Sequence, residues 1–210
     1  MLNAASILVC YAVREEVGKA VLNTRAEVLI TGMGRRNAAE CLQRRLSVRR
    51  PTLVLTCGFA GGLNPALPTG TVIFSAEGNA DLSTSLLALG VVPVRFFCAD
   101  RVAITALEKQ QLRQTTGADA VEMESEIIRT LCQHQNLPSA TIRVISDAAH
   151  EDLPLDFNAL LTARHKIHFG KLAAALIRSP NKIPRLLEFQ KRTTQARDAL
   201  DRALAKLLAP

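Results

Sequence analysis

Residues 52–58, TLVLTCG, form an almost unbroken run of apolar and β-branched side chains that ends at a glycine. Such a run predicts a strand that is buried on both faces, as in a parallel sheet covered by helices. Further strand-like runs lie on both sides of it, at residues 6–12, 26–34, 71–77, 91–99 and 139–147. Helix-like patterns alternate with them, at residues 13–22, 35–48, 105–116, 124–136 and 155–179. This alternation predicts an α/β domain with three layers, α/β/α, around a central and mostly parallel sheet.

Length and composition indicate an ordinary globular protein. The chain has 210 residues, of which 48% are apolar and 21% are charged, and one domain can bury a substantial core at this size. No apolar run has the length of a transmembrane helix, and the N-terminus lacks the pattern of a secretory signal. We therefore divide the chain into a domain at 1–180 and a basic, amphipathic helical extension at 181–210 that packs on it.

The net charge of +7 is concentrated in the C-terminal part. Residues 1–163 carry 15 Lys/Arg and 16 Asp/Glu, whereas residues 164–210 carry 11 and 3. The basic segment is either a solvated helix face or a surface that attracts an acidic partner. Aromatic residues make up only 4% of the chain and tryptophan is absent, so bases have little to stack on and no nucleic-acid partner is expected. A weak contact with a membrane surface is the remaining prediction for this helix.

Cysteine and histidine do not form recognisable metal motifs. The five cysteines are an odd number, and no two stand at CxxC spacing. They are typical of small buried side chains in a reducing compartment, which predicts a cytoplasmic protein. The four histidines form no HExxH motif. We expect neither a metal site nor a cofactor.

Acidic residues follow several of the predicted strands. Glu16 comes a few residues after the first strand run, Glu122 and Glu124 begin a helix-like pattern, and Asp147 ends the run at 139–147. Ligands of α/β sheets bind beyond the carboxyl ends of the strands, so these acids are expected at one edge. Cleavage of a glycosidic bond needs an acid for the leaving group and a base or anion near the sugar. Binding of magnesium and capping of helices are the alternatives for such acids.

Five motifs in order resemble the nucleoside phosphorylase superfamily, and most closely its 5′-methylthioadenosine/S-adenosylhomocysteine nucleosidase branch. They are YAVREEV, ITGMGRRNAA, TCGFAGGLNPALPTGTVI, ADAVEMES and IRVISDAA, and together they cover nearly the whole chain. The resemblance implies the nucleoside phosphorylase fold and cleavage of the N-glycosidic bond of adenosine or a 5′-substituted adenosine. Because family members commonly assemble, it also implies a homodimer.

The same resemblance implies roles for individual residues. Asp147 would protonate N7 of the purine, Glu16 would activate water, and Glu124 would bind the ribose hydroxyls. The residues that would line the substrate site are Val13, Gly58, Phe59, Val102, Ala103, Glu122, Met123 and Ser146, with Met123 against the sugar, Val102 and Ala103 beside the base and Ser146 next to Asp147. Glu122 has a supporting role in the family, and a carboxylate that caps a helix N-terminus is the equal alternative.

Departures from the family pattern leave three functions open. The family's phosphate-binding serine is replaced by Phe59, and Thr56 stands where the phosphorylases have an arginine. Since a dianion needs cationic side chains and oriented donors, their loss favours hydrolysis over phosphorolysis. A phosphate-dependent phosphorylase and a non-catalytic nucleoside-binding protein remain as alternatives.

The C-terminal part resembles a particular sub-branch. Residues 168–204 are similar to the tail of bacterial proteins labelled hopanoid-associated phosphorylase, whose implied role is to remove adenine from an adenosyl-hopane precursor. The segment between Glu77 and Asp100 is shorter than in the nucleosidases, which predicts a more open pocket around the 5′ substituent. Together with the basic helix, this predicts a protein that is peripheral to the inner membrane.

Overall fold

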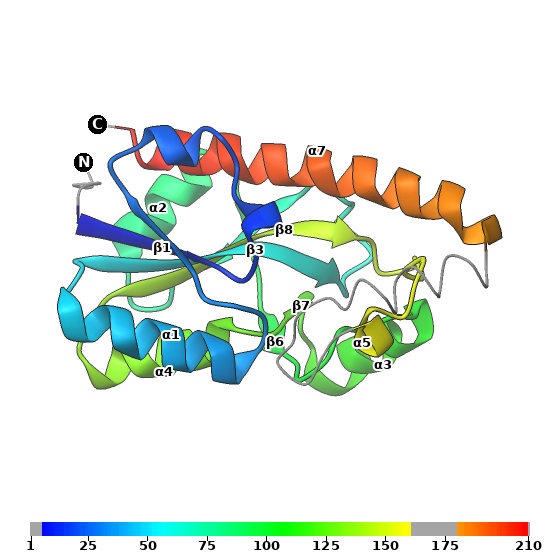
Figure 1. Ribbon diagram of the computed structural model, residues 1–210, viewed down its shortest axis with the longest axis horizontal. Coiled ribbons are helices and arrows are strands. Elements are labelled where there is room, and N and C mark those ends of the chain that lie inside the picture. Colours follow the sequence, from blue (N-terminus) through cyan, green and yellow to red (C-terminus); the bar gives the residue numbers. More distant parts are fainter. Residues whose placement is uncertain (1–5, 161–179, 210) are drawn as a thin grey trace.

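The computed structural model describes residues 6–160 and 180–209, and its centre is a twisted sheet of eight strands (Figure 1). The main path of the sheet runs β2-β1-β3-β8-β4-β5, while β7 pairs with β3 and with β6. The strands are β1 (Ile7–Tyr11), β2 (Glu27–Ile30), β3 (Leu53–Gly62), β4 (Val72–Ser75), β5 (Val92–Pro93), β6 (Phe96–Cys98), β7 (Ala120–Glu122) and β8 (Ser139–Asp147). The predicted central strand at 52–58 is therefore the first part of β3.

Most strand pairs are parallel. The parallel pairs are β1 with β2, β1 with β3, β3 with β8, β4 with β5, and β6 with β7. The two antiparallel pairs are β4 with β8 and β7 with β3. Because β1, β3 and β8 lie in the middle of the sheet, both of their faces are covered, which explains their nearly continuous apolar sequences.

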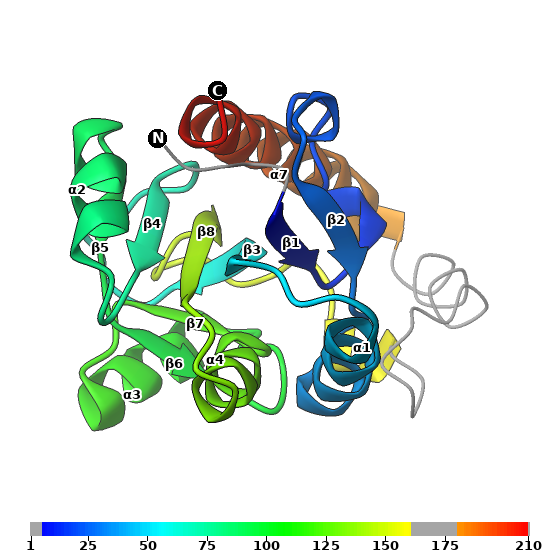
Figure 2. The same cartoon turned by 90° about the vertical axis from the view of Figure 1, so that its left-hand side faces the viewer.

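Helices cover both faces of the sheet, which confirms the predicted three layers (Figure 2). One face carries α1 (Arg35–Val48) and α4 (Ser125–His134), which pack on β1 and β3 through Leu8, Leu42 and Ile128. The other face carries α2 (Ala80–Ala88) and α7 (Ile183–Leu207), which share one core cluster with the sheet. Within the described residues, two further α-helices are α3 (Ala106–Thr116) and the short α5 (Phe157–Leu160).

Two predicted elements differ in the structure. The predicted helix at 13–22 is wrong: this segment contains only two 3-10 turns, Arg14–Glu16 and Val21–Asn23. Asp201 of α7 accepts hydrogen bonds from the N–H groups of Ala20 and Val21, both at 2.8 Å, so these groups do not bond to helical carbonyls. The run at 91–99 is divided into β5 and β6, and α2 was not predicted at all. Of the predicted helix at 155–179, only α5 lies within the described residues.

The basic C-terminal helix packs on the sheet along only half of its length. Ala196, Leu200 and Leu204 are almost completely buried in the core, whereas Ile183 and Leu187 keep 40% and 60% of their surface exposed. The predicted apolar stripe therefore faces the protein only in its C-terminal half. No helix within the described parts of the chain is long and apolar enough to span a membrane.

Candidate active site

Three of the predicted acids meet around one buried arginine, Arg143 of β8. Its Nη2 atom lies 2.7 Å from Oε2 of Glu122 and 3.4 Å from Oε2 of Glu124. It also donates to the hydroxyl of Thr56 at 3.1 Å, and Nη1 donates to the carbonyl of Cys57 at 3.2 Å. Burial opposes the charge of Arg143, but the carboxylates of Glu122, Glu124 and Glu16 raise its pKa. The cluster thus joins β3, β7 and β8 through one guanidinium group.

Glu16 is held on this cluster by backbone N–H groups. Its Oε2 accepts hydrogen bonds from Ala12 at 3.0 Å and Val13 at 3.2 Å, and its Oε1 accepts one from Phe59 at 2.9 Å. The 3-10 turn at Arg14–Glu16 folds the side chain back toward the end of β1. Burial raises the pKa of Glu16 above its usual value, against the effect of Arg143 and these three donors. A fixed carboxyl group of this kind is suited to accept a proton from water.

Glu122 acts as a support for the start of α4. Its Oε2 accepts the N–H groups of Glu124 at 3.0 Å and Ser125 at 2.8 Å, and its Oε1 accepts the Ser125 hydroxyl at 2.7 Å. With the Arg143 contact, its carboxylate is fully engaged by protein donors. The Glu122 carboxylate thus caps the N-terminus of α4 and also binds Arg143 of the cluster.

Glu124 is the acid of the cluster with the fewest protein partners. Oε1 accepts the N–H of Gly34 at 2.8 Å, in the loop that begins α1, and Oε2 faces Arg143. Burial and the neighbouring Glu122 and Glu16 raise its pKa to about 7, although Arg143 and the Gly34 N–H act in the opposite direction. Met123 lies between the two glutamates in the chain and is buried.

Gly58 and Phe59 form the floor of the cluster on β3. Gly58 has φ +140°, and a Cβ there would stand 2.4 Å from Oε1 of Glu16 and 2.8 Å from Nη1 of Arg143. Only glycine leaves space for both groups. Phe59 packs against the core cluster shared with α7, and its contact with Glu16 is made by its backbone N–H.

Asp147 lies apart from the arginine cluster. Its Oδ1 accepts the hydroxyl of Ser146 at 2.6 Å, and its Oδ2 lies 2.5 Å from the ammonium group of Lys109. The register of β3 and β8 shifts between Ala60 and Gly61, so Asp147 and not Ser146 stands opposite Gly61. Irregularities of this kind re-aim side chains at the ends of strands. Gly58 and Gly61 are three residues apart on β3, so the backbone positions beside the two groups of acids lie about 10 Å apart along the strand.

The segment at Val102 and Ala103 precedes α3. Asn158 of α5 accepts the N–H of Val102 and donates to its carbonyl, both at 2.9 Å. Ala103 is buried, and its backbone N–H and carbonyl have no hydrogen-bond partner among the residues that the structure describes. A backbone N–H donor and a carbonyl acceptor on the same residue are together complementary to the edge of a nucleobase.

Two charged residues of this region were not predicted. Arg143 is 1% exposed and Lys109 is completely buried. A signal for Arg143 was present, because a charge in the middle of the apolar run at 139–147 requires a buried carboxylate partner. Lys109 stands on a helix with many polar residues, and its sequence neighbours do not distinguish it from a solvent-exposed lysine.

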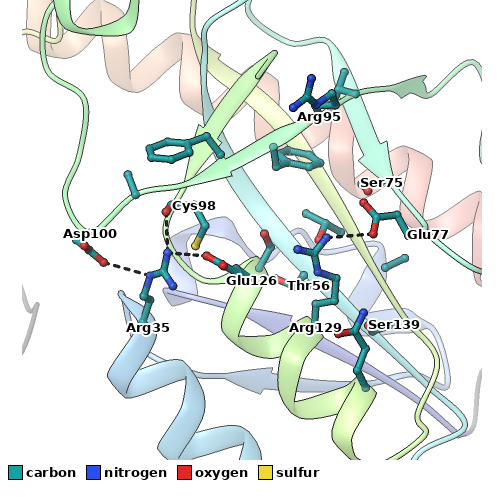
Figure 3. A pocket seen from close by; sticks show the side chains of 18 of the residues that line it. Arg35, Thr56, Ser75, Glu77, Arg95, Cys98, Asp100, Glu126, Arg129 and Ser139 are labelled. Atoms are coloured by element: carbon teal, nitrogen blue, oxygen red, sulfur yellow. Dashed lines mark hydrogen bonds and ion pairs between the residues drawn. The ribbon is translucent and has the colours of Figure 1, made fainter. Parts of the chain in front are cut away.

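A large cavity lies beside the arginine cluster and not at the acids. Its volume is about 970 Å³, and Glu16, Glu122, Glu124 and Asp147 are not among its lining residues. Thr56, labelled in Figure 3, and Ser125 form part of its wall. Thr56 also contacts Arg143, and Ser125 also contacts Glu122. Arg35 bridges Asp100 and Glu126 on one side of it. The candidate site is therefore defined by its hydrogen-bonded acids, and this cavity is separate from them.

Metal ligands are not grouped in the described parts of the chain. Within residues 6–160 and 180–209, no group of three or more His, Cys, Asp or Glu side chains is arranged to hold a metal ion. The five cysteines are all free thiols.

Comparisons with known proteins show what the chain is similar to. Residues 76–178 match the model of the phosphorylase superfamily. A curated relative, the 5′-methylthioadenosine/S-adenosylhomocysteine nucleosidase of Anoxybacillus flavithermus, is 26% identical over 189 residues, which cover 74% of this chain and 81% of the relative.

Solved structures have the same fold over almost the whole chain. Futalosine hydrolase of Helicobacter pylori superposes with a TM-score of 0.70 at 14% identity and covers 96% of both chains. The nucleosidase of Campylobacter jejuni gives a TM-score of 0.67 at 15% identity and covers 96% of this chain and 97% of its own. That of Neisseria meningitidis, solved with methylthio-immucillin-A, gives 0.66 at 17% identity with the same coverage. In its matching residues and its fold, the chain is similar to the phosphorylase superfamily, and it resembles the 5′-methylthioadenosine/S-adenosylhomocysteine nucleosidases.

Proposed function

We propose that this protein is a purine nucleosidase that hydrolyses the N-glycosidic bond of adenosine or of a 5′-substituted adenosine. The observation that carries the proposal is the placement of two groups of acids along β3, with Glu16 and Glu124 beside Arg143 at one point and Asp147 at the other. A nucleoside between them would present its sugar to the first group and its base to the second. The nucleosidase names of the relatives support the same reaction.

In the proposed reaction, Glu16 takes a proton from a water molecule whose oxygen forms a bond with C1′ of the sugar. The bond between C1′ and N9 breaks, and its electron pair passes into the purine. Asp147, after it has taken up a proton from solvent, gives that proton to N7, so that adenine leaves as a neutral molecule. Glu124 accepts hydrogen bonds from the ribose hydroxyls, and Met123 packs against the sugar. The free backbone groups of Ala103 bind the edge of the base.

Electrostatics support water, and not phosphate, as the acceptor. Arg143 lies close to the carboxyl groups of Glu122, Glu124 and Glu16. Its Nη1 and Nη2 atoms contact Glu122, Glu124, Thr56 and the carbonyl of Cys57. A phosphate dianion would have to enter a cluster that contains three carboxyl groups and one guanidinium group. Because like charges repel and Arg143 is already engaged, the site disfavours a dianion.

The identity of the 5′ substituent is a finer proposal. The shortened segment between Glu77 and Asp100 favours a large substituent, and an adenosyl-hopane is the one suggested by the C-terminal resemblance. The exposed, basic first half of α7 would then contact an anionic membrane surface weakly.

Product analysis by chromatography tests the proposal. The protein is incubated with adenosine, methylthioadenosine and S-adenosylhomocysteine, each with and without phosphate. We expect adenine and free sugar at rates that phosphate does not change. The variant Asp147→Asn should lower kcat by about 100-fold or more, whereas Asp81→Asn on the exposed surface of α2 should not change it. Dependence on phosphate would indicate a phosphorylase, and binding of adenine without any turnover would indicate a binding protein.

A further inference from the structure

Lys109 is a buried charged residue to which the proposed reaction gives no role. Its side chain is completely buried on α3. A lysine is rarely buried in this way, because its ammonium group loses hydration and must be compensated by nearby acceptors. Its Nζ atom has three such acceptors: Oδ2 of Asp147 at 2.5 Å, the carbonyl of Ala148 at 2.9 Å and the carbonyl of Glu151 at 2.8 Å. Each proton of an ammonium group therefore has one acceptor.

These three contacts connect the two segments that would hold the base. Lys109 stands in the second turn of α3, the helix that follows Val102 and Ala103. Its acceptors lie at the end of β8 and in the loop directly after it. Lys109 thus fixes the distance between the base-binding backbone and Asp147 together with two hydrogen bonds, from the N–H of Leu153 to the carbonyl of Ile104 and from the N–H of Ala106 to Asp152.

The contact also fixes the direction of the Asp147 carboxyl group. With Oδ2 bound by Lys109 and Oδ1 bound by Ser146, rotation about the last bond of the side chain would break both interactions. When Asp147 transfers its proton to N7, it becomes a carboxylate. The adjacent ammonium stabilises that carboxylate, and so it stabilises the transition state more than the ground state.

We propose that Lys109 is a positioning residue of the nucleosidase reaction, which orients Asp147 toward N7 of the purine and stabilises it as it gives up its proton. This inference rests on the proposed function. Lys109 does not touch the substrate in this arrangement, and its whole effect passes through Asp147.

Two variants separate the effects of charge and hydrogen bonding. Lys109→Met keeps most of the side-chain volume and removes both, while Lys109→Gln keeps a donor without the charge. For methylthioadenosine we expect Lys109→Met to lower kcat by about 10- to 100-fold, below the full contribution of a general acid. Its KM should stay within about threefold, since ground-state binding of the sugar is unchanged. The kcat of Lys109→Gln should lie between those of Lys109→Met and the wild type.

The exposed Lys19→Met is the matched control, and its kcat and KM should equal those of the wild type.

A binding measurement tests whether Lys109 acts on the contact between Asp147 and N7 of the base. Calorimetry gives the affinities for adenine and for 7-deazaadenine, which carries carbon at that position. The wild type should prefer adenine, and Lys109→Met should lose this preference while it still binds both bases. An equal loss of affinity for both bases, or a kcat that Lys109→Met leaves unchanged, would overturn the inference. If the wild type binds adenine without turnover, the proposed function fails, and the ratio of the two affinities still decides the role of Lys109. A wild type that binds no adenine would overturn both.

Discussion

Gly58 lies at a point where the arginine cluster leaves no space for a side chain. A methyl group at Gly58 would stand 2.4 Å from Glu16 and 2.8 Å from Arg143, so Gly58→Ala must displace one of them. We expect it to lower kcat/KM by about 100-fold or more, because a displaced carboxyl group can no longer accept the proton of the attacking water. Gly70→Ala is a matched control, since Gly70 also has a positive φ of +89° but nothing within 4 Å.

Both glycine variants should lose about 1 kcal/mol of unfolding free energy from backbone strain alone, measured in urea. The steady-state rate should fall only in Gly58→Ala. Equal activity of the two variants would show that the space above Gly58 is not needed.

The raised pKa of Glu124 predicts that the stability of the folded protein depends on pH. Burial raises its pKa to about 7 in the folded protein, above the ordinary value of 4.5. Between these values the folded state binds more protons than the unfolded state, so its contribution to stability is present below about pH 4.5 and is lost as the pH rises through about 7. Glu124→Gln keeps the shape of the side chain and cannot titrate. Thermal unfolding between about pH 5 and 8 should therefore decline less steeply in Glu124→Gln than in the wild type. Parallel curves would contradict the raised pKa.

At the scale of elements, α7 is attached to the segment that follows Glu16. Asp201 accepts two backbone hydrogen bonds there, and a Cβ on Gly18 would overlap its carboxyl group at 2.0 Å from Cγ. Asp201→Ala should lower the unfolding free energy by about 2–4 kcal/mol, because two buried N–H groups lose a charged acceptor. Asp198→Ala, three residues earlier on the same helix, removes only a contact with the neighbouring Arg197 and should cost about 0.5 kcal/mol or less. Urea unfolding of both variants gives the comparison, and equal costs would refute the attachment.

Regular elements were predictable where local pattern and tertiary packing agree. Residues 35–48 and 139–147 have the same bounds in the prediction and in the structure, as α1 and β8. Thr105, the first residue of the predicted helix at 105–116, caps α3 and accepts the N–H of Glu108. The segment at 13–22 has a helical pattern, but Asp201 lies 180 residues away in sequence and binds the N–H groups that a helix would use. No local signal could reveal that competition.

At the scale of the whole molecule, the candidate site depends on contacts that are distant in sequence. The positions of Glu16, Glu124 and Asp147 after strand runs indicated one edge of the sheet, and the order of motifs indicated the family. The division into an arginine cluster and a separate Asp147 could not be predicted, because it results from the pairing of β3 with β8 and the register shift at Gly61. Lys109 likewise acquires its role only from packing, since 39 residues separate it from the carbonyl of Ala148.

The uneven charge of the molecule predicts where it would contact an anionic surface. Lys182 directly precedes α7, and Arg185 and Lys191 lie in its first half, where Ile183 and Leu187 are exposed. The second half of α7 belongs to the core. A truncation at residue 180 would remove core side chains, so charge substitutions are the sharper test. Replacing these three residues by glutamine should weaken binding to anionic vesicles, measured by sedimentation, by about 100-fold, at about 1 kcal/mol for each basic residue.

The matched control replaces the exposed Arg25, Arg44 and Arg49 by glutamine, which changes the net charge equally but on a different part of the surface. Binding of the wild type should weaken as salt is added, because the Debye length is only about 8 Å at physiological ionic strength. If both triple variants sediment alike, the attraction comes from net charge and not from α7. If neither differs from the wild type, the basic residues of this helix serve only solvation, and the helix is simply part of the core.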